Sequence, residues 1–314
     1  MDGILIIDKP AGVTSHDVVA RVRQILHERR GGHTGTLDPF ATGVLIVLVG
    51  RATRLSQFFT LAEKEYYAVV RFGYSTDTGD LTGKSASETS ESTRPSSPLT
   101  WVDLEIEAAL QSLCGEIDQI PPMYSAKKRD GRKLYELARL GATVERKAVR
   151  IKVREFEALR CGGRLLKNNG DGTVDLAVRV VCSAGTYVRT LAEALGDRLG
   201  IGSHLAELRR TRAGDFSITS AVTLDQLEAK VDKGALATIL LLPDAALRSM
   251  HFVDLTERDA ELVRRGIAIS LSRHSGGAAI QGDNVRMRDE GKLVAVGCYD
   301  AVTKSLKPRV VLPK

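Results

Sequence analysis

Hydrophobic positions along residues 4–74 predict two buried strands, a helix between them and a third strand. The apolar runs at 4–7 and 44–49 are short and bounded by glycine or proline, which is typical of buried strands. Ser15 is expected to cap the helix, whose apolar residues fall on one face. These residues are Val18, Val19, Val22, Ile25 and Leu26. The segment "EYYAVVRFGY" is rich in aromatic and β-branched residues, which favours the third strand.

The composition changes abruptly in the middle of the chain. Residues 85–98 are nearly all Ser, Thr, Glu and Pro, which predicts a mobile surface insertion or a short linker. Thr100 with Asp103 is then expected to open a helix that runs to Cys114, with Gly115 as its stop.

Beyond this helix the pattern mixes strands and helices. The turn residues of "KNNGDGTV" predict a hairpin that joins strands at about 149–160 and 174–182. The segment "TYVRTLAEALGDRLG" predicts an amphipathic helix ending at Gly200, and helical patterns continue to about residue 247. Because there is no strict strand–helix–strand rhythm, we expect an α+β main domain.

The pattern of apolar residues changes again after residue 247, where the apolar runs become short. Thr256, Asp259 and Gly266 are placed to frame one helix, and the remaining apolar runs are short and broken by "SGG", "QGDN" and "DEGK". We therefore expect two domains, 1–247 and a small β-rich domain at 248–314.

Positive charge is in modest excess and is clustered. Lys and Arg number 45 against 39 Asp and Glu, a net charge of +6, which suggests a polyanionic partner such as nucleic acid. One cluster spans residues 127–154, and a second comprises Arg209, Arg210 and Arg212. Charge alone is equally compatible with ordinary solvated surfaces.

Cysteine usage and hydropathy bear on the compartment. Cys114, Cys161, Cys182 and Cys298 lie far apart, so neither a zinc site nor a disulfide framework is indicated, and buried free thiols in a reducing compartment fit best. The N-terminal apolar run is too short for a signal peptide or a membrane span. We expect a cytoplasmic protein with no membrane segment.

Familiar catalytic motifs are missing from the sequence. There is no GxSxG, HExxH or GxGxxG motif, and "GDLTGKS" has one residue too few between its glycines for a phosphate loop. Carboxylate chemistry remains, and it centres on "RRGGHTGTLDPFATGVL", residues 29–45. Asp38 lies there between a predicted helix and a buried strand, where reacting groups are often displayed. On spacing alone, an Asp before Pro in a Gly- and Thr-rich segment is most often a plain turn former.

Three other side chains could act with Asp38. Tyr187 and Arg189 lie at a strand-to-helix junction, and an arginine can hold a carboxylate ionised through two hydrogen bonds. Tyr66 offers a flat ring for stacking on a base and a phenol for proton transfer. Taken singly, each could equally serve core packing or a surface ion pair.

Six motifs carry a resemblance, and they occur in a fixed order. They are "DKPAGVTSHDVV", "GHTGTLDPFATGVL", "KEYYAVVRFGYSTDTGD", "QIPPMYSAKKRDGRKLYELARLG", "CSAGTYVRTLAEALG" and "HLAELRRTRAG". Over about residues 3–225 the chain closely resembles the bacterial TruB family, tRNA pseudouridine synthases that isomerise uridine 55 in the T loop. The remainder resembles, more loosely, a small PUA-type RNA-binding domain.

The resemblance implies roles for individual residues. It implies that Asp38 is the nucleophile, that Tyr66 stacks on the target base and that Arg189 pairs with the aspartate. Further implied contacts come from the pocket residues Tyr187 and Leu208 and from His33, which holds loop nucleotides apart. From the basic clusters we expect Lys127, Lys128 and Arg209 to contact RNA as well. Lys9 with Pro10 falls on an N-terminal Lys-Pro motif whose role is either structural or RNA-contacting.

The resemblance also implies a fold and a set of partners. The fold is a catalytic α+β domain on a mixed, largely antiparallel sheet, in which a segment at about 119–150 grips RNA, followed by a PUA-like domain. The expected partner is the T stem-loop of tRNA, reached by base flipping, and we expect a monomer that needs no cofactor, metal or obligate protein partner. Two alternatives stay open: a guide-dependent rRNA pseudouridine synthase of the related class, and a tRNA-folding chaperone. A DNA-binding module is disfavoured, since no helix-turn-helix or zinc-finger pattern is present.

Overall fold

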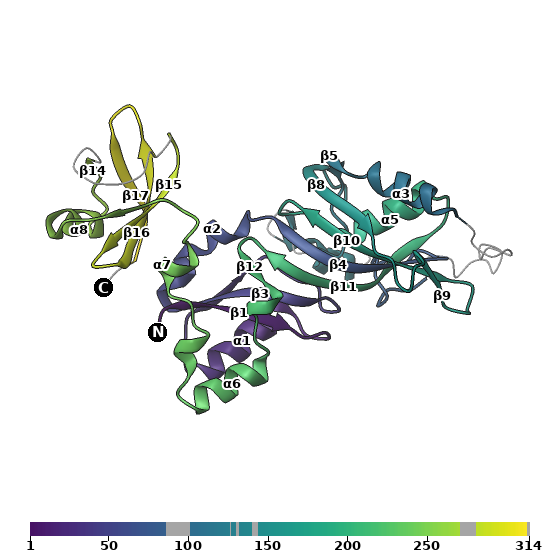
Figure 1. The fold of residues 1–314 in the computed structure, drawn as a ribbon, viewed down its shortest axis with the longest axis horizontal. Coiled ribbons are helices and arrows are strands. Elements are labelled where there is room, and N and C mark those ends of the chain that lie inside the picture. The colour runs from purple at the N-terminus through teal and green to yellow at the C-terminus, as the bar shows by residue number, and fades with distance from the viewer. Residues whose placement is uncertain (86–100, 126, 130–131, 140–143, 271–280, 313–314) are drawn as a thin grey trace.

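The protein consists of one long mixed sheet covered by helices and a smaller β-rich body at its C-terminal end (Figure 1). The computed structural model describes residues 1–314 except 86–100, 126, 130–131, 140–143, 271–280 and 313–314. Within the described part, no helix has both the length and the hydrophobicity needed to cross a membrane.

Among the described residues the long sheet has ten strands in the order β1-β3-β11-β4-β10-β8-β5, with β2, β9 and β12 paired to β3, β10 and β11. Only the pairing of β3 with β11 is parallel. The expected mixed, largely antiparallel sheet is therefore confirmed. The strands are β1 (Gly3–Lys9), β2 (Gly31–Thr34), β3 (Thr42–Val49), β4 (Lys64–Phe72), β5 (Gly115–Gln119), β8 (Val149–Ala158), β9 (Leu166–Asn168), β10 (Val174–Cys182), β11 (Ser203–Ala213) and β12 (Phe216–Ser217).

Helices cover the two halves of this sheet separately. In the first half, apolar residues of β1 and β3 form one cluster with α1 (Ser15–Ile25) and α6 (Leu224–Asp232). In the second half, α3 (Asp103–Gln111) and α5 (Val188–Arg198) cover β4, β10 and β8. The remaining short elements are η1 (Gly50–Leu55), α2 (Ser56–Thr60), the β6 (Lys128–Arg129) and β7 (Arg132–Lys133) hairpin, α4 (Leu134–Arg139), η3 (Ile218–Ser220), η4 (Leu236–Thr238) and α7 (Pro243–Ala246).

The C-terminal body is a five-stranded sheet, within the described residues, in the order β13-β15-β16-β17-β14. Its elements are β13 (Phe252–Asp254), α8 (Glu257–Arg264), β14 (Ile269–Ser270), β15 (Asn284–Asp289), β16 (Lys292–Asp300) and β17 (Ser305–Val311). The expected helix framed by Thr256, Asp259 and Gly266 is confirmed, and the Thr256 hydroxyl caps it by accepting the Asp259 N–H.

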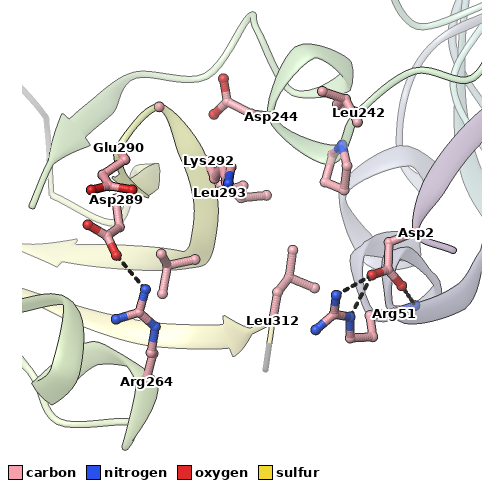
Figure 2. A pocket seen from close by; sticks show the side chains of 13 residues that line it. Asp2, Arg51, Leu242, Asp244, Arg264, Asp289, Glu290, Lys292, Leu293 and Leu312 are labelled. Carbon is pink, nitrogen blue, oxygen red and sulfur yellow. Dashed lines mark hydrogen bonds and ion pairs between the residues drawn. The ribbon is translucent and has the colours of Figure 1, made fainter. Parts of the chain in front are cut away.

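The smaller sheet packs on the main sheet through shared apolar side chains. Val296 and Val310 belong to the same cluster as Leu247 and Phe59, and Arg54 donates to the Val311 carbonyl at 2.9 Å. A cavity of about 530 Å³ opens beside this junction, with the Asp2–Arg51 pair on one side and the Arg264–Asp289 pair on the other (Figure 2). The division at residue 247 stays a prediction, because side chains from both sides of it form one cluster.

The helical pattern that we predict up to about residue 247 is wrong over Ser203–Ala213, which form β11. This segment is rich in Leu, Ala, Glu and Arg, all good helix formers. It lies between β3 and β4, is interrupted by two register shifts, and is buried at consecutive positions, so it shows no clear period of two. Tertiary pairing has overridden local propensity.

Other local expectations are corrected at element ends. Thr14, not Ser15, caps α1, because the Ser15 hydroxyl instead exchanges hydrogen bonds with the Leu37 backbone. The α3 helix begins at Asp103; the expected cap at Thr100 lies outside the described residues, as does the insertion at 85–98 from residue 86 onward.

Two further corrections concern connections and thiols. The "KNNGDGTV" turn joins β9, rather than β8, to β10, because a short extra strand intervenes. The described cysteines are all free, as expected, but only Cys182 is buried, and Cys161 is exposed.

We predict that Gly43→Ala destabilises the protein far more than Gly234→Ala. Both glycines have positive φ, +102° and +66°, so both alanines are strained by roughly 1–2 kcal/mol. A Cβ at Gly43 would also lie 2.2 Å from the Arg210 carbonyl oxygen, where β3 meets β11, whereas nothing lies within 4 Å at Gly234. Denaturant unfolding should show a loss of about 3 kcal/mol or more for Gly43→Ala. Equal losses in the two variants would contradict a close strand contact at this point.

Candidate active site

The loop that carries Asp38 is held from several sides. It follows β2, which occupies the first part of the segment we expected to be loop, and it leads into β3. The Pro39 carbonyl accepts the Gly12 N–H at 2.8 Å and the Lys9 ammonium at 3.2 Å. The Ala41 N–H donates to the Asp38 carbonyl at 3.1 Å, which closes a tight turn. The loop is therefore fixed to the N-terminal strand before any ligand binds.

Asp38 is gripped by Arg189, as the sequence predicts. Arg189 lies in the first turn of α5, and its Nε and Nη2 approach the two Asp38 carboxylate oxygens at 2.9 Å and 3.2 Å. The same guanidinium donates to the carbonyls of Thr78 and Tyr124, each at 2.7 Å, and lies 3.6 Å from the Asp80 carboxylate. Arg189 is only 3% exposed, and these contacts fix its position.

The electrostatic balance at Asp38 is set mainly by loss of water. Burial raises the pKa of Asp38 above its ordinary value, Arg189 opposes this, the nearby Asp80 raises the pKa further, and Lys9 lowers it. The arginine is therefore what favours an ionised carboxylate at this place.

Asp38 and Arg189 line a cavity of about 410 Å³. Its walls come from the Asp38 loop, from the end of α2, from β4, from the turn before α5 and from β11. The lining residues are Gly35, Thr36, Leu37, Asp38, Thr60, Leu61, Lys64, Tyr66, Ser125, Ser183, Ala184, Gly185, Thr186, Tyr187, Val188, Arg189, Leu208 and Arg210.

The structure brings five of the predicted site residues together in this cavity. Besides Asp38 and Arg189 they are Tyr66, Tyr187 and Leu208. Tyr66 is buried on β4, and burial raises the pKa of its phenol, which the Arg210 charge partly offsets. Tyr187 is fixed by a reciprocal backbone pairing with the Gln119 side-chain amide, at 2.8 Å and 3.0 Å. Its exposure and aromatic ring suit contact with a bound base.

Lys9 lies inside the protein rather than at the cavity surface. It is 0% exposed, and its ammonium donates to the carbonyls of Pro10, Val13 and Pro39. Burial lowers the pKa of Lys9 to about 8, while the Asp38 charge acts in the opposite direction. Of the two roles left open by the sequence, this arrangement favours the structural one.

The other predicted RNA-contacting residues do not line the cavity. His33 is half-buried on β2, and burial lowers the pKa of its imidazole. Arg209 forms an ion pair with Asp8 at 2.7 Å. Lys127 is exposed, and Lys128 lies in β6 with its side chain outside the described set. Their roles stay predictions.

Two cationic residues line the cavity but are not predicted as site residues from the sequence: Lys64 and Arg210. Arg210 lies directly opposite Tyr66 in the β11–β4 register, and Lys64 is two residues before Tyr66. Side chains two apart share a face of a strand. Recognising 203–213 as a strand would have placed Arg210 on the same face as Leu208, and Arg209 on the other. Within the described ranges, no group of three or more His, Cys, Asp or Glu side chains is arranged to hold a metal ion.

Comparison with known proteins identifies the family. The model described as "TruB family pseudouridylate synthase (N terminal domain)" matches residues 23–188, and that described as "tRNA pseudouridylate synthase B C-terminal domain" matches residues 189–248. The chain belongs to the TruB family. A relative from Geobacter sulfurreducens, tRNA pseudouridine synthase B, is 41% identical and is matched over 98% of both chains. The protein of the same name from Thermobifida fusca is 44% identical over 88% of this chain and 89% of its own.

Solved structures place this TruB-family chain in the pseudouridine synthase fold. An H/ACA RNP bound to a substrate RNA containing 2′-deoxyuridine contains a chain with a TM-score of 0.72 and 25% identity, over 99% of this chain and 85% of that one. A chain of the archaeal box H/ACA sRNP Nop10-Cbf5 complex gives 0.70 and 26%, over 99% and 86%. The expected α+β class of the main domain is thus confirmed, and the PUA-like assignment of the smaller sheet stays a prediction.

We predict a pH-dependent stability difference between the wild type and Asp38→Asn. Because the folded-state pKa of Asp38 lies above 3.8, the folded protein binds this proton more tightly than the unfolded chain. The stability contributed by Asp38 is complete below pH 3.8 and is lost as the pH rises through the folded-state pKa. Denaturant unfolding from pH 4 upward should show the wild type losing stability relative to the variant. The attraction of Arg189 is already part of the folded-state pKa of Asp38, so what remains is the difference between neutral Asp and Asn, which does not change with pH. A difference that is constant, or that grows in favour of the wild type with pH, would contradict this.

Proposed function

We propose that this protein isomerises uridine to pseudouridine at position 55 in the T loop of tRNA. Its membership of the TruB family and the names of its relatives support this substrate and reaction. The observation that carries the proposal at the level of chemistry is the carboxylate of Asp38, which Arg189 holds with two contacts in a cavity walled by Tyr66 and Leu208.

The reaction exchanges one glycosidic bond for another. The N1–C1′ bond breaks, the uracil turns, C5 bonds to C1′, and the C5 proton is lost while N1 gains one. Atoms and oxidation state are conserved, so the conversion itself needs no redox partner. A carboxylate can serve either by attacking covalently or by stabilising positive charge at C1′. Both routes require an ionised Asp38, and Arg189 favours that form.

The target base must leave the RNA stack to reach Asp38. Extrusion costs a few kcal/mol, and stacking on an aromatic ring returns roughly 1–3 kcal/mol per base. We assign the stacking to Tyr66, the apolar wall to Leu208 and a further pocket contact to Tyr187. His33 is assigned to the gap that the extruded base leaves behind.

The surrounding RNA is held by positive charge outside the cavity. We assign phosphate contacts to Lys127, Lys128 and the rest of the segment at about 119–150. Arg209 keeps 38% of its side chain exposed beside Asp8, so one edge of its guanidinium can meet a phosphate. The sheet at 248–314 is proposed to add PUA-like RNA contacts. We further propose that the protein acts in the cytoplasm as a monomer without an obligate protein partner or cofactor.

A second candidate function follows from the structural neighbours. The chains in H/ACA particles align over 99% of this protein, which raises the possibility of guide-dependent action. The bacterial relatives named tRNA pseudouridine synthase B are closer, at 41–44% identity against 25–26%. Isomerisation of an unmodified tRNA transcript by the purified protein alone would exclude a requirement for guide or partner. Activity only after guide RNA and partner proteins are added would select the second candidate.

We predict that Asp38→Asn abolishes isomerisation and leaves RNA binding nearly intact. The change removes the charge that both chemical routes need and keeps the shape of the side chain. Chemical mapping of pseudouridine in a T-loop hairpin should detect no product, and the Kd should change by less than about tenfold, or 1.4 kcal/mol. Full turnover by this variant would remove Asp38 from the mechanism.

We also predict that Lys127→Glu raises the KM for tRNA with little effect on kcat. Lys127 is exposed and does not line the cavity, so in our assignment it contributes attraction to phosphate rather than chemistry. Lys233→Glu, an equal charge reversal at the exposed C-terminal cap of α6, is the control for net charge. An unchanged KM for Lys127→Glu at moderate salt would reassign Lys127 to ordinary surface.

A further inference from the structure

Arg210 is the largest of the fully buried side chains, and it lacks a carboxylate partner among the described residues. Only 1% of it is exposed. Its hydrogen bonds go to backbone carbonyls, Val44 from Nε at 2.7 Å and Gly35 from Nη2 at 2.8 Å. Burying a cation without an opposite charge costs free energy, and packing with an apolar side chain would avoid that cost. A charged group retained under these conditions calls for a reason beyond folding.

The two carbonyls that Arg210 binds flank the Asp38 loop. Gly35 comes three residues before Asp38, and Val44 follows it at the start of β3. One guanidinium therefore ties the outgoing and returning arms of the loop together. Because the guanidinium is planar with fixed N–H directions, it also sets the separation of those arms.

The glycines of the loop leave room for this contact. A Cβ at Gly35 would lie 3.3 Å from Nη1 of Arg210, and a Cβ at Gly43 would lie 2.2 Å from the Arg210 carbonyl oxygen. Both glycines also have positive φ. Two of the small residues in "GGHTGTLDPFATG" are thus explained by the close approach of Arg210, not by contact with a ligand.

Arg210 also lies beside Tyr66, an aromatic residue of the same cavity. It is the β11 residue opposite Tyr66 of β4, and its charge partly offsets the rise that burial causes in the pKa of the Tyr66 phenol. Both residues line the same cavity as Asp38. One buried group therefore holds the loop of the carboxylate and lies opposite Tyr66 in the same cavity.

We propose that Arg210 is a positioning residue of the uridine-isomerising site, which fixes the Asp38 loop opposite Tyr66 through its hydrogen bonds to the carbonyls of Gly35 and Val44. This inference rests on the proposed function. Arg210 acts through the groups it holds, so its loss should lower the rate of chemistry more than the binding of RNA.

The test compares Arg210→Met with Arg286→Met. Arg286 is the control because it is also buried, at 6% exposed, and donates to the carbonyls of Asp244 and Met250, but in the C-terminal sheet. Unlike Arg210 it also pairs with a carboxylate, that of Asp244, and being buried it is not one of the proposed RNA contacts. On tRNA transcript, Arg210→Met should lower kcat by roughly 10²-fold with a KM within about threefold of wild type, as expected for misplaced reacting groups. Arg286→Met should keep the wild-type kcat.

A second measurement does not depend on activity. Amide hydrogen exchange at Leu37 and Ala41, whose N–H groups are bonded within or beside the loop, should accelerate in Arg210→Met and not in Arg286→Met. Should Arg210→Met fail to fold, Arg210→Lys decides by the same two measurements. Lysine keeps the charge but lacks the planar fork that spans both carbonyls, so a smaller fall in kcat and faster loop exchange are expected.

The outcomes separate this inference from the proposed function. If the wild-type protein makes no pseudouridine in tRNA, the proposed function is wrong. Faster amide exchange of the loop in the Arg210 variant would then still support Arg210 as the residue that fixes the loop. Unchanged loop exchange overturns the inference whatever the activity. An active wild type with an Arg210 variant of unchanged kcat, or with a raised KM alone, overturns it as well.

Discussion

The ion pair of Arg189 with Asp38 is the contact on which the chemistry of this site depends. Burial pushes the carboxylate toward its protonated form, and the guanidinium opposes that with two short contacts. Arg189 can do so because it is itself immobilised by the carbonyls of Thr78 and Tyr124 and by the charge of Asp80. A carboxylate that is partly dehydrated, ionised and aimed is a stronger nucleophile or charge stabiliser than one in open water.

The fold places this pair where the two halves of the long sheet meet. The halves are joined by β3 and β11, whose parallel register covers only the pairs Arg209–Thr42 and Arg210–Gly43. The Asp38 loop enters β3 at that seam, while β4 and α5 bring Tyr66 and Arg189 from the second half. Residues from distant parts of the chain converge at the seam, and the cavity opens there. Family membership and this geometry lead to the same reaction, isomerisation of an extruded uridine.

Much of this arrangement could be predicted from the sequence, and the main failure, at 203–213, has a physical cause. Uniform apolar runs fixed the place of β1 and β3, and the Asp-Pro loop pointed to Asp38. Residues 203–213 were misread because β11 is buried on both sides and made of helix formers. When this segment is taken for a helix, the alternation of its side chains between the two faces of a strand is lost. Arg209 rather than Arg210 is then predicted as a site residue. In the structure Arg209 pairs with Asp8, and Arg210 enters the cavity. The pairing of β11 with β3 and β4, which lie far from it in the sequence, cannot be predicted from the local pattern of residues.

The pH dependence of kcat/KM for isomerisation of a tRNA transcript tests the central claim most directly, because this ratio reports ionisations of the free enzyme. The account predicts that the rate falls on the acid side as Asp38 takes up one proton. In Arg189→Lys that acid limb should move to higher pH, since a single ammonium cannot bind both carboxylate oxygens and so lowers the pKa of Asp38 less. An acid limb that stays at the same pH in the variant would contradict the claim that Arg189 keeps Asp38 ionised.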